Sequence, residues 1–269
     1  MLTLNNVYAG YKGIDVLKNI SMTVNKGENL CILGPNGCGK TTLIKAIAGL
    51  IPIKGNVQID GINISNMKRY EIAKKIAVMS QISTIYFSYT VFETVLLGRY
   101  LHMKGKIFKE PSEKDKKYVY DCIKAVGMYK FRDRQITTLS GGQLQRVFLA
   151  RTLAQEPNII LLDEPTNHLD LKYQAELIDY LKEWSKSGEH SVIGILHDIN
   201  LAMRLADNIL LLKNGKITAH GPTEDVISSK NLNEVYDMDV VEFMLNSLNK
   251  WKKFDTNSYL HNTQLRKIK

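Results

Sequence analysis

The chain has 269 residues, of which 44% are hydrophobic and 23% charged, so it can bury a full core and is not intrinsically disordered. No apolar run approaches the ~20 residues needed to cross a bilayer, the amino terminus lacks the form of a secretory signal, and the three cysteines follow no disulfide or zinc pattern, which favours a reducing cytoplasm. The net charge of +9 suggests a polyanionic partner, namely nucleotide, nucleic acid or anionic lipid, without choosing among them.

The amino-terminal segment has the alternation of half-buried strands. Leu2–Val7 and Ile20–Val24 both alternate apolar and polar residues. Tyr11 lies between them, in a turn flanked by Gly10 and Gly13. An aromatic ring on such a loop could stack on an adenine base, or it could pack against the edge of the core. The residues alone leave both interpretations open.

A glycine-rich phosphate-binding loop follows the apolar run Cys31–Leu33. Gly34, Gly39, Lys40 and Thr41 satisfy the spacing G-x-x-x-x-G-K-[ST], and an apolar helical stretch comes directly afterwards. The glycines let successive backbone N–H groups point into one concavity, and the helix adds the positive end of its dipole. We therefore expect Lys40 to reach the terminal phosphates and Thr41 to hold Mg²⁺. The residues expected to bind nucleotide here are Gly34, Pro35, Asn36, Gly37, Cys38, Gly39, Lys40, Thr41 and Thr42.

The middle of the chain changes from strand to helix. A surface helix is expected at 69–75, and an apolar strand at 76–80 stops at Gln81. From about 82 to 156 the apolar residues mostly recur at helical spacing, for example in 112–128. This stretch is predicted to be a helical subdomain inserted into an α/β core.

A second glycine-containing helix start lies at Leu139–Gln143. Ser140 and Gln143 form a capping box, which explains both residues structurally. Gly141 and Gly142 are not explained that way, because they remove side chains from the helix start and leave its N–H groups open to an anion. The sequence predicts a second phosphate-sized site here, far along the chain from the first, so one nucleotide need not touch both within a single chain.

Two adjacent carboxylates follow a buried strand. Asn158–Leu162 is apolar enough to be buried on both faces, as in a parallel sheet. Asp163 and Glu164 come directly after it, where two acids could simply cap the next turn. Carboxylates at the end of an apolar strand are costly unless they are used. Asp163 suits Mg²⁺ coordination, directly or through water, and Glu164 suits the base that orients an attacking water.

A histidine follows another buried strand. His197 comes directly after the apolar run 191–196. Its position repeats that of Gly34, Gln81 and Asp163, since all four follow apolar strands. Open α/β sheets bind ligands at the carboxyl ends of their strands. We therefore expect these residues to gather around one triphosphate.

These motifs, in this order, resemble the ATP-binding subunits of ABC transporters from residue 2 to about residue 242. The matching segments are Gly34–Thr42 (Walker A), Gln81 (Q-loop), Leu139–Gln143 (the LSGGQ signature), Ile159–Glu164 (Walker B), Asn167–Asp170 (D-loop) and His197 (switch histidine). Tyr11 matches the aromatic residue that stacks on adenine in this family, which favours that interpretation.

The resemblance implies a P-loop NTPase core of the ABC ATPase type. This α/β core is a mixed sheet with flanking helices and an antiparallel β subdomain. The implied division is an ATPase domain at 1–225, with the helical subdomain at 82–156 inserted in it, and a helical extension with a basic tail at 226–269. The positive charge of the tail favours a solvated segment, with weak attraction to an anionic membrane as the alternative.

The resemblance also implies an ATPase that works as a head-to-tail homodimer. Each ATP would lie between Walker A of one copy and the signature, Ser140 to Gln143, of the other. The implied catalytic residues are Lys40, Gln81, Glu164 and His197, the implied Mg²⁺ ligands are Thr41, Gln81 and Asp163, and Asp170 would join the nucleotide site. ATP-driven closure would power transmembrane permease subunits at the cytoplasmic face of the membrane.

The subfamily indicated is an importer. The segments 77–81, 90–100 and 235–240 are similar to ATPases that import iron(III)-siderophore, haem or cobalamin-type chelates, and they could also be ordinary residues shared by many importers. An extracytoplasmic substrate-binding protein is then an indirect partner, and no nucleic acid is expected. The alternatives are an importer of another solute, such as a metal ion, a soluble ABC-type ATPase acting on nucleic acid, and a regulatory module without turnover. The single cassette, the absence of a heptad run, and the presence of Glu164 and His197 disfavour the last two.

Cys38 lies inside Walker A, close to a helix start and to Lys40. Both neighbours favour a thiolate. We therefore predict a lowered pKa for the Cys38 thiol, and an ATPase that thiol reagents block unless ATP protects it.

Overall fold

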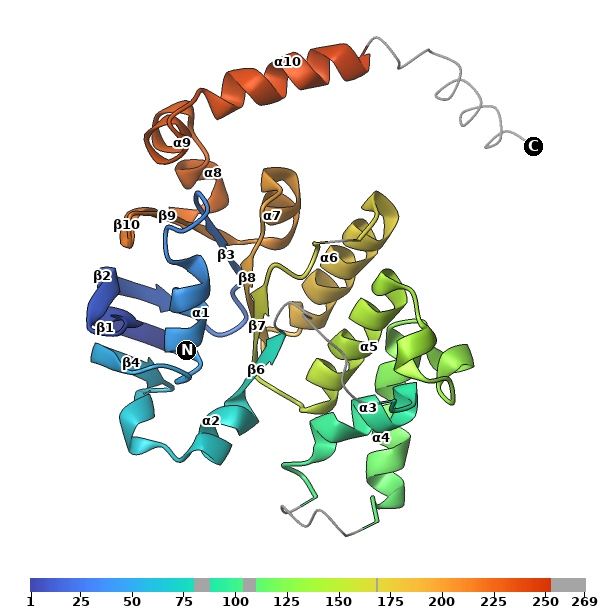
Figure 1. The fold of residues 1–269 in the computed structure, drawn as a ribbon. Helices are drawn as coiled ribbons and strands as arrows, with labels where there is room; N and C mark the ends of the chain where they lie inside the picture. Colours follow the sequence, from blue (N-terminus) through green and yellow to red (C-terminus); the bar gives the residue numbers. More distant parts are fainter. Residues whose placement is uncertain (80–87, 104–109, 168, 253–269) are drawn as a thin grey trace.

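The computed structural model describes residues 1–79, 88–103, 110–167 and 169–252. Within these residues, two sheets form the centre of the fold (Figure 1), one antiparallel with strand order β2-β1-β4-β5 and one with strand order β10-β9-β3-β8-β7-β6. The strands are β1 (Leu2–Tyr11), β2 (Ile14–Val24), β3 (Leu30–Leu33), β4 (Ile53–Ile59), β5 (Ile62–Asn63), β6 (Ile76–Met79), β7 (Ile159–Asp163), β8 (Ser191–Ile195), β9 (Asn208–Lys213) and β10 (Lys216–Pro222).

The antiparallel sheet begins with a hairpin of β1 and β2 that is longer than the alternation predicts. Asn6 and Asn19 have left-handed backbones, with φ of 49° and 57°, and the Asn6 side-chain amide donates a 2.7 Å hydrogen bond to Asn19 Oδ1. The pairing register shifts at this point, between Leu4 and Val7. A register shift interrupts the alternation of apolar and polar residues along a strand. The alternation therefore predicts shorter strands than the structure contains.

The second sheet is parallel from β6 to β9, with β10 added antiparallel at its edge. Its central strands are buried on both faces. In β7, for example, Ile160 and Leu162 join one hydrophobic cluster, while Ile159 and Leu161 join the other. Such strands read as continuous apolar runs, which is why β3, β7 and β8 are visible in the sequence.

Helices cover both faces of this sheet. Helix α1 and the antiparallel sheet pack on one face, and α3 to α7 pack on the other. The helices are α1 (Lys40–Ile47), α2 (Arg69–Lys75), α3 (Val91–Leu96), α4 (Glu113–Ala125), α5 (Gly141–Ala154), α6 (Leu171–Ser185), α7 (Ile199–Leu205), α8 (Thr223–Val226), α9 (Ser229–Tyr236) and α10 (Val240–Lys252), with short 3₁₀ turns at Ile64–Asn66, Leu97–Arg99, Tyr129–Phe131 and Ile136–Thr138. The predicted fold class is confirmed, and α2 has the predicted bounds.

The described residues between β6 and β7 are mostly helical and are joined by a buried arginine. Arg99, which is 4% exposed, donates a 3.1 Å hydrogen bond from Nε to Asp115 Oδ1 in α4 and another of 3.1 Å from Nη1 to the Ala154 carbonyl oxygen at the end of α5. A buried guanidinium is stable only with such partners. Arg99 therefore fixes α4 against α5, whereas the division of the chain at 82–156 and at 225/226 stays a prediction.

In the described part of the chain, no helix combines the length and the hydropathy needed to cross a membrane.

Candidate functional site

The predicted site residues follow strands that are neighbours in the parallel sheet. β3 pairs with β8, and β8 pairs with β7, all parallel. Gly34, His197 and Asp163 therefore lie at the same edge of the sheet, as the sequence predicts. Gln81, expected after β6 as a catalytic and Mg²⁺-binding residue, lies outside the described residues.

The phosphate loop connects β3 to α1, and glycine is required in it. Gly34 has φ of 152°, and a Cβ built on it would lie 2.1 Å from the Leu212 carbonyl oxygen. Gly39, with φ of 112°, is the N-cap of α1. Lys40 is 5% exposed, and its Nζ donates hydrogen bonds of 2.8 and 2.9 Å to the carbonyl oxygens of Gly34 and Pro35. The loop thus curls around the Lys40 ammonium, which points toward the concavity where phosphate oxygens would lie.

The sequence predicts Tyr11 in a turn, but it is the last residue of β1. Its side chain is 44% exposed, and Lys45 Nζ of α1 lies 5.9 Å from its ring centroid. An exposed aromatic ring next to the helix that follows the phosphate loop is suited to stacking on a base. The adenine-stacking role itself stays a prediction.

Thr41 and Asp163 meet across the site. Thr41 Oγ1 donates a 3.0 Å hydrogen bond to Asp163 Oδ1. Burial raises the pKa of Asp163, and the neighbouring Glu164 raises it further, while Thr41, Lys45 and Lys40 act in the opposite direction. A half-buried carboxylate beside a hydroxyl fits Mg²⁺, which prefers oxygen ligands and usually takes only one or two from carboxylates. The described residues hold no cluster of three or more metal-binding side chains.

Glu164 is held by two side chains in a strained backbone conformation. Its φ is 55°, a left-handed value that a non-glycine residue adopts only when its surroundings enforce it. His197 Nε2 lies 2.7 Å from Glu164 Oε1, and Asn167 Nδ2 donates a 2.6 Å hydrogen bond to Oε2. Both carboxylate oxygens are therefore engaged, and the group can accept a proton from a water placed beside it.

The prediction of a lowered pKa for Cys38 is wrong. Burial raises the pKa of the Cys38 thiol above its ordinary value, because the loss of water outweighs the attraction of Lys40 and the backbone hydrogen bonds. The side chain is 5% exposed. The thiolate that reacts with thiol reagents is therefore less populated here than in a free cysteine.

We expect alkylation of native Cys38 at pH 7 to be slower than that of the same residue in the unfolded chain. Because the raised pKa keeps the thiol mostly protonated at neutral pH, the rate should still rise steeply with pH above pH 7. Mass spectrometry of the peptide that contains Cys38, after timed alkylation with iodoacetamide, measures this rate. Fast, pH-independent labelling would contradict the raised pKa.

The signature segment forms the predicted capping box at the start of α5. Ser140 Oγ accepts a hydrogen bond from the Gln143 backbone N–H (3.3 Å), and Gln143 Oε1 accepts one from the Ser140 backbone N–H (3.1 Å). The two glycines differ. A Cβ on Gly141 would meet no atom within 4 Å, whereas one on Gly142 would lie 3.4 Å from the Tyr173 ring of α6. Gly141 therefore has open space around its Cα, whereas Gly142 also allows α5 to pack closely on α6.

Asp170 is the N-cap of α6. Its Oδ1 accepts a 3.1 Å hydrogen bond from the Tyr173 backbone N–H. This contact explains the residue structurally, and its predicted place in the nucleotide site stays a prediction.

Tyr236, at the end of α9, reaches the phosphate loop, which the sequence analysis did not foresee. Burial raises the pKa of Tyr236, although a hydrogen bond from the Gly34 backbone N–H opposes the shift. Lys213 of β9 holds the end of α9 by donating hydrogen bonds to the Glu234 carbonyl oxygen (2.7 Å) and to Asp237 Oδ1 (2.8 Å). Nothing in the local sequence signals a contact between residues about 200 positions apart.

The sequence is similar to those of ABC transporter ATP-binding proteins. The chain is 38% identical over 225 residues to the petrobactin import ATP-binding protein FpuD of Bacillus anthracis. This match covers 83% of the chain and 82% of FpuD. It is 40% identical over 232 residues to the uncharacterized ABC transporter ATP-binding protein YvrA of Bacillus subtilis, covering 86% of this chain, although the match spans only 52% of YvrA.

The fold is also similar to solved structures of ABC transporters and of their ATP-binding cassettes. A metal-chelate type ABC transporter in an inward-facing conformation matches with a TM-score of 0.77 and 28% identity, covering 88% of this chain and 89% of that chain. The ATP-binding cassette MJ0796, in a dimeric post-hydrolysis state with ADP and Pi, matches with a TM-score of 0.72 and 32% identity, covering 83% and 99%. Residues 17–167 match the family described as ABC transporter. The chain belongs to this family as one of its ATP-hydrolysing, ATP-binding proteins.

Proposed function

We propose that this chain is the ATP-hydrolysing subunit of an ABC importer and works as a head-to-tail homodimer. The observation that carries the proposal is the separation of the two expected phosphate-binding features. Lys40, Thr41, Asp163, Glu164 and His197 meet at one edge of the sheet, whereas the bare helix start at Gly141 belongs to α5, on the other face of the sheet from α1. A second copy would supply its Gly141 to the first copy's nucleotide.

Catalysis in such a dimer consists of positioning and charge stabilisation. Lys40 would bind the terminal phosphates of ATP from inside the curled loop. Glu164, oriented by Asn167, would accept the proton of the attacking water, and His197 would contact the γ-phosphate. Mg²⁺ held by Thr41 and Asp163 would neutralise phosphate charge when bound.

ATP can drive closure only through a higher affinity for the closed dimer than for the separate copies. The contacts of Ser140 and Gly141 with the partner's nucleotide would supply that difference. Hydrolysis removes the γ-phosphate and with it part of this affinity, so the dimer reopens. Gln81 would relay this cycle to transmembrane permease subunits, and the chain would then lie at the cytoplasmic face of a membrane.

For the cargo we propose iron(III)-siderophore, haem or cobalamin-type chelates, delivered by an extracytoplasmic substrate-binding protein. The names of FpuD and of the metal-chelate type transporter support this choice. The test is ATP-dependent uptake in liposomes that contain the chain with its permease and binding protein. Uptake of ferric siderophore, haem or cobalamin supports the proposal, and uptake of a free divalent metal alone favours the alternative, an importer of another solute.

Head-to-tail pairing predicts that two inactive variants restore each other. Lys40→Ala destroys the phosphate loop but keeps the signature. Gly141→Arg blocks the signature but should keep the fold, because a Cβ there meets no atom within 4 Å. About half of the dimers in an equal mixture are mixed, and each has one intact site of two, so we expect about a quarter of the wild-type ATPase activity.

The controls are the two variants measured alone at the same total concentration, each of which should be close to inactive. A mixture no more active than its components would overturn head-to-tail pairing. ATPase activity that depends on added nucleic acid would instead favour a soluble ATPase acting on nucleic acid.

A further inference from the structure

The loop after Glu164 is attached to helices on both sides. Gln145 of α5 donates a hydrogen bond from Nε2 to the Pro165 carbonyl oxygen. Gln174 of α6 donates hydrogen bonds of 3.1 Å to the carbonyl oxygens of Thr166 and Leu169. Three backbone carbonyls of one short loop are thus bound by two side-chain amides.

This attachment acts next to the strained residue. Pro165 directly follows Glu164, whose φ of 55° persists only while its neighbours fix the chain. Asn167 and His197 hold the Glu164 carboxylate, but Gln145 is the side chain that fixes the backbone immediately after it. Removing the Gln145 donor would leave the backbone directly after Glu164 without this side-chain contact, so the backbone could relax and shift the carboxylate.

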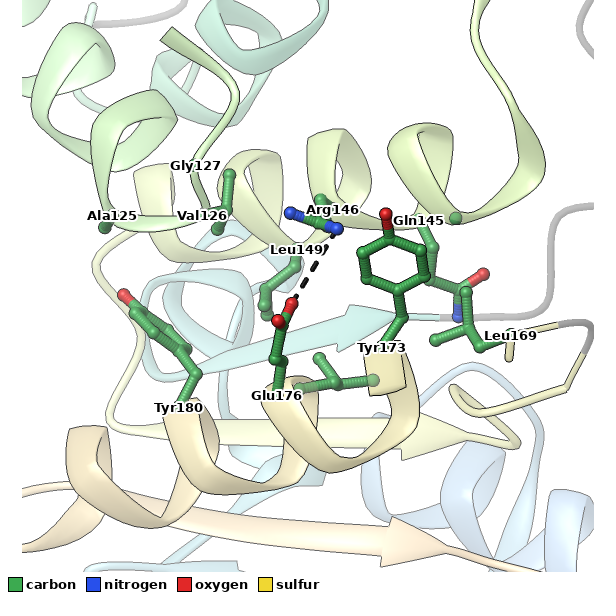
Figure 2. A pocket seen from close by; sticks show the side chains of 12 residues that line it. Ala125, Val126, Gly127, Gln145, Arg146, Leu149, Leu169, Tyr173, Glu176 and Tyr180 are labelled. Atoms are coloured by element: carbon green, nitrogen blue, oxygen red, sulfur yellow. Dashed lines mark ion pairs between the residues drawn. The ribbon is translucent and has the colours of Figure 1, made fainter. Parts of the chain in front are cut away.

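Gln145 lies one turn into the helix that begins with the signature glycines. A cavity of about 220 Å³ lies at this level between α5, α6 and the end of α4. Figure 2 shows the Arg146 guanidinium at this cavity, beside the Tyr173 ring and pointing to Glu176. Arg146 Cζ lies 4.1 Å from the ring centroid, and Arg146 Nη2 lies 3.7 Å from Glu176 Oε2. Gln145 itself lines this cavity and links α5 to the Pro165 carbonyl oxygen, so a shift of the α5 start would reach Pro165 through this hydrogen bond.

We propose that Gln145 is a positioning residue for Glu164 of its own chain, and that it connects the two ATP sites of the dimer. This inference rests on the proposed head-to-tail pairing. In that dimer the signature of one copy faces the partner's ATP, while Glu164 of the same copy serves its own ATP. The hydrogen bond from Gln145 to Pro165 therefore joins a part of one site to the catalytic base of the other.

Mixed dimers with two different affinity tags and one active site test the proposal. In the cis dimer, Gln145→Met is in the chain with the intact Glu164, and the partner carries Glu164→Gln. In the trans dimer, Gln145→Met and Glu164→Gln are in the same chain, and the partner is wild type. The reference dimer pairs wild type with Glu164→Gln. Single-turnover hydrolysis of ATP is measured in all three.

We expect hydrolysis to be about tenfold slower in the cis dimer than in the reference, and within about twofold of the reference in the trans dimer. If Gln145 only supports the signature segment, the reverse pattern is expected, with slow hydrolysis in the trans dimer alone. That pattern, or equal rates in all three dimers, would overturn the proposal.

Two further variants keep the experiment specific. Gln145→Glu has the same shape but offers no donor, so it should repeat the cis result of Gln145→Met. Lys172→Met removes a cation 3.9 Å from Glu176, on the same helix α6, and should leave hydrolysis unchanged. If the reference pair fails to close on ATP, the proposed function falls and the connection between sites falls with it. If it closes and the cis effect is absent, only the role of Gln145 is wrong.

Discussion

Replacing Glu164 with Gln should reduce ATP hydrolysis by about a thousandfold or more while ATP binding is retained. The amide keeps the size of the side chain but cannot accept the proton of the attacking water. It also replaces one of the two carboxylate oxygens, which now face His197 and Asn167, with an NH₂ group. Because the contacts that close the dimer would remain, the variant should accumulate as an ATP-bound dimer, visible by size-exclusion chromatography coupled to light scattering.

The matched control for this variant is Asp179→Asn. Asp179 is also a carboxylate in an ion pair, 2.6 Å from Arg204 Nη2, but it lies on the surface of α6 away from the site. It should hydrolyse ATP at the wild-type rate and show no ATP-dependent dimer beyond that of wild type. Normal turnover in Glu164→Gln would remove this residue from the mechanism, and a strictly monomeric ATP-bound variant would overturn closure.

Replacing Asp163 with Asn should reduce Mg²⁺-dependent hydrolysis by about a hundredfold or more and at the same time stabilise the fold. Asn is a poor Mg²⁺ ligand, but it can still accept the hydrogen bond from Thr41. Burial and the neighbouring Glu164 raise the pKa of Asp163 above its ordinary value, so the ionised group destabilises the folded chain at neutral pH. That penalty is present above the folded pKa and disappears as the pH falls below it.

The measurement is chemical unfolding of both proteins without Mg²⁺ or ATP, at pH 7.5 and at successively lower pH. The free energy of unfolding of Asp163→Asn should exceed that of wild type at pH 7.5, and the difference should shrink on acidification. Adding Mg²⁺ and ATP should reverse the order, because ligand stabilises only the chain that binds it well. A variant less stable than wild type at every pH would contradict the electrostatic account of Asp163.

The fold could be predicted where burial leaves a clear pattern. β3, β7 and β8 are buried on both faces and read as apolar runs, and α2 has a helical pattern with lysines in its last turn. β9 and β10 were not predicted. β9 is a short apolar run that periodicity cannot distinguish from a helix, and β10 contains Gly221 and Pro222, which usually end a strand.

The candidate site could be predicted in its residue types but not in its connections. The positions after the parallel strands were sufficient to bring Thr41 to Asp163, because β3 and β7 both pair in parallel with β8 and end at one edge of the sheet. The contacts of Gln145 and Tyr236 depend on tertiary packing between distant segments and leave no local pattern. For Cys38 the sequence revealed the nearby cation but not the depth of burial, and burial dominates the pKa.

The curled phosphate loop has a consequence for how a nucleotide is received. The Lys40 ammonium is already withdrawn from water and is hydrogen-bonded by two backbone carbonyls of its own loop. A phosphate oxygen bound there would meet a cation that lost its hydration shell during folding, so little water would have to be removed on binding. Folding has thus already met part of the dehydration cost of binding a triphosphate. A substitution elsewhere that lets water reach the Lys40 ammonium would weaken nucleotide binding, even if it changed no residue that contacts the nucleotide.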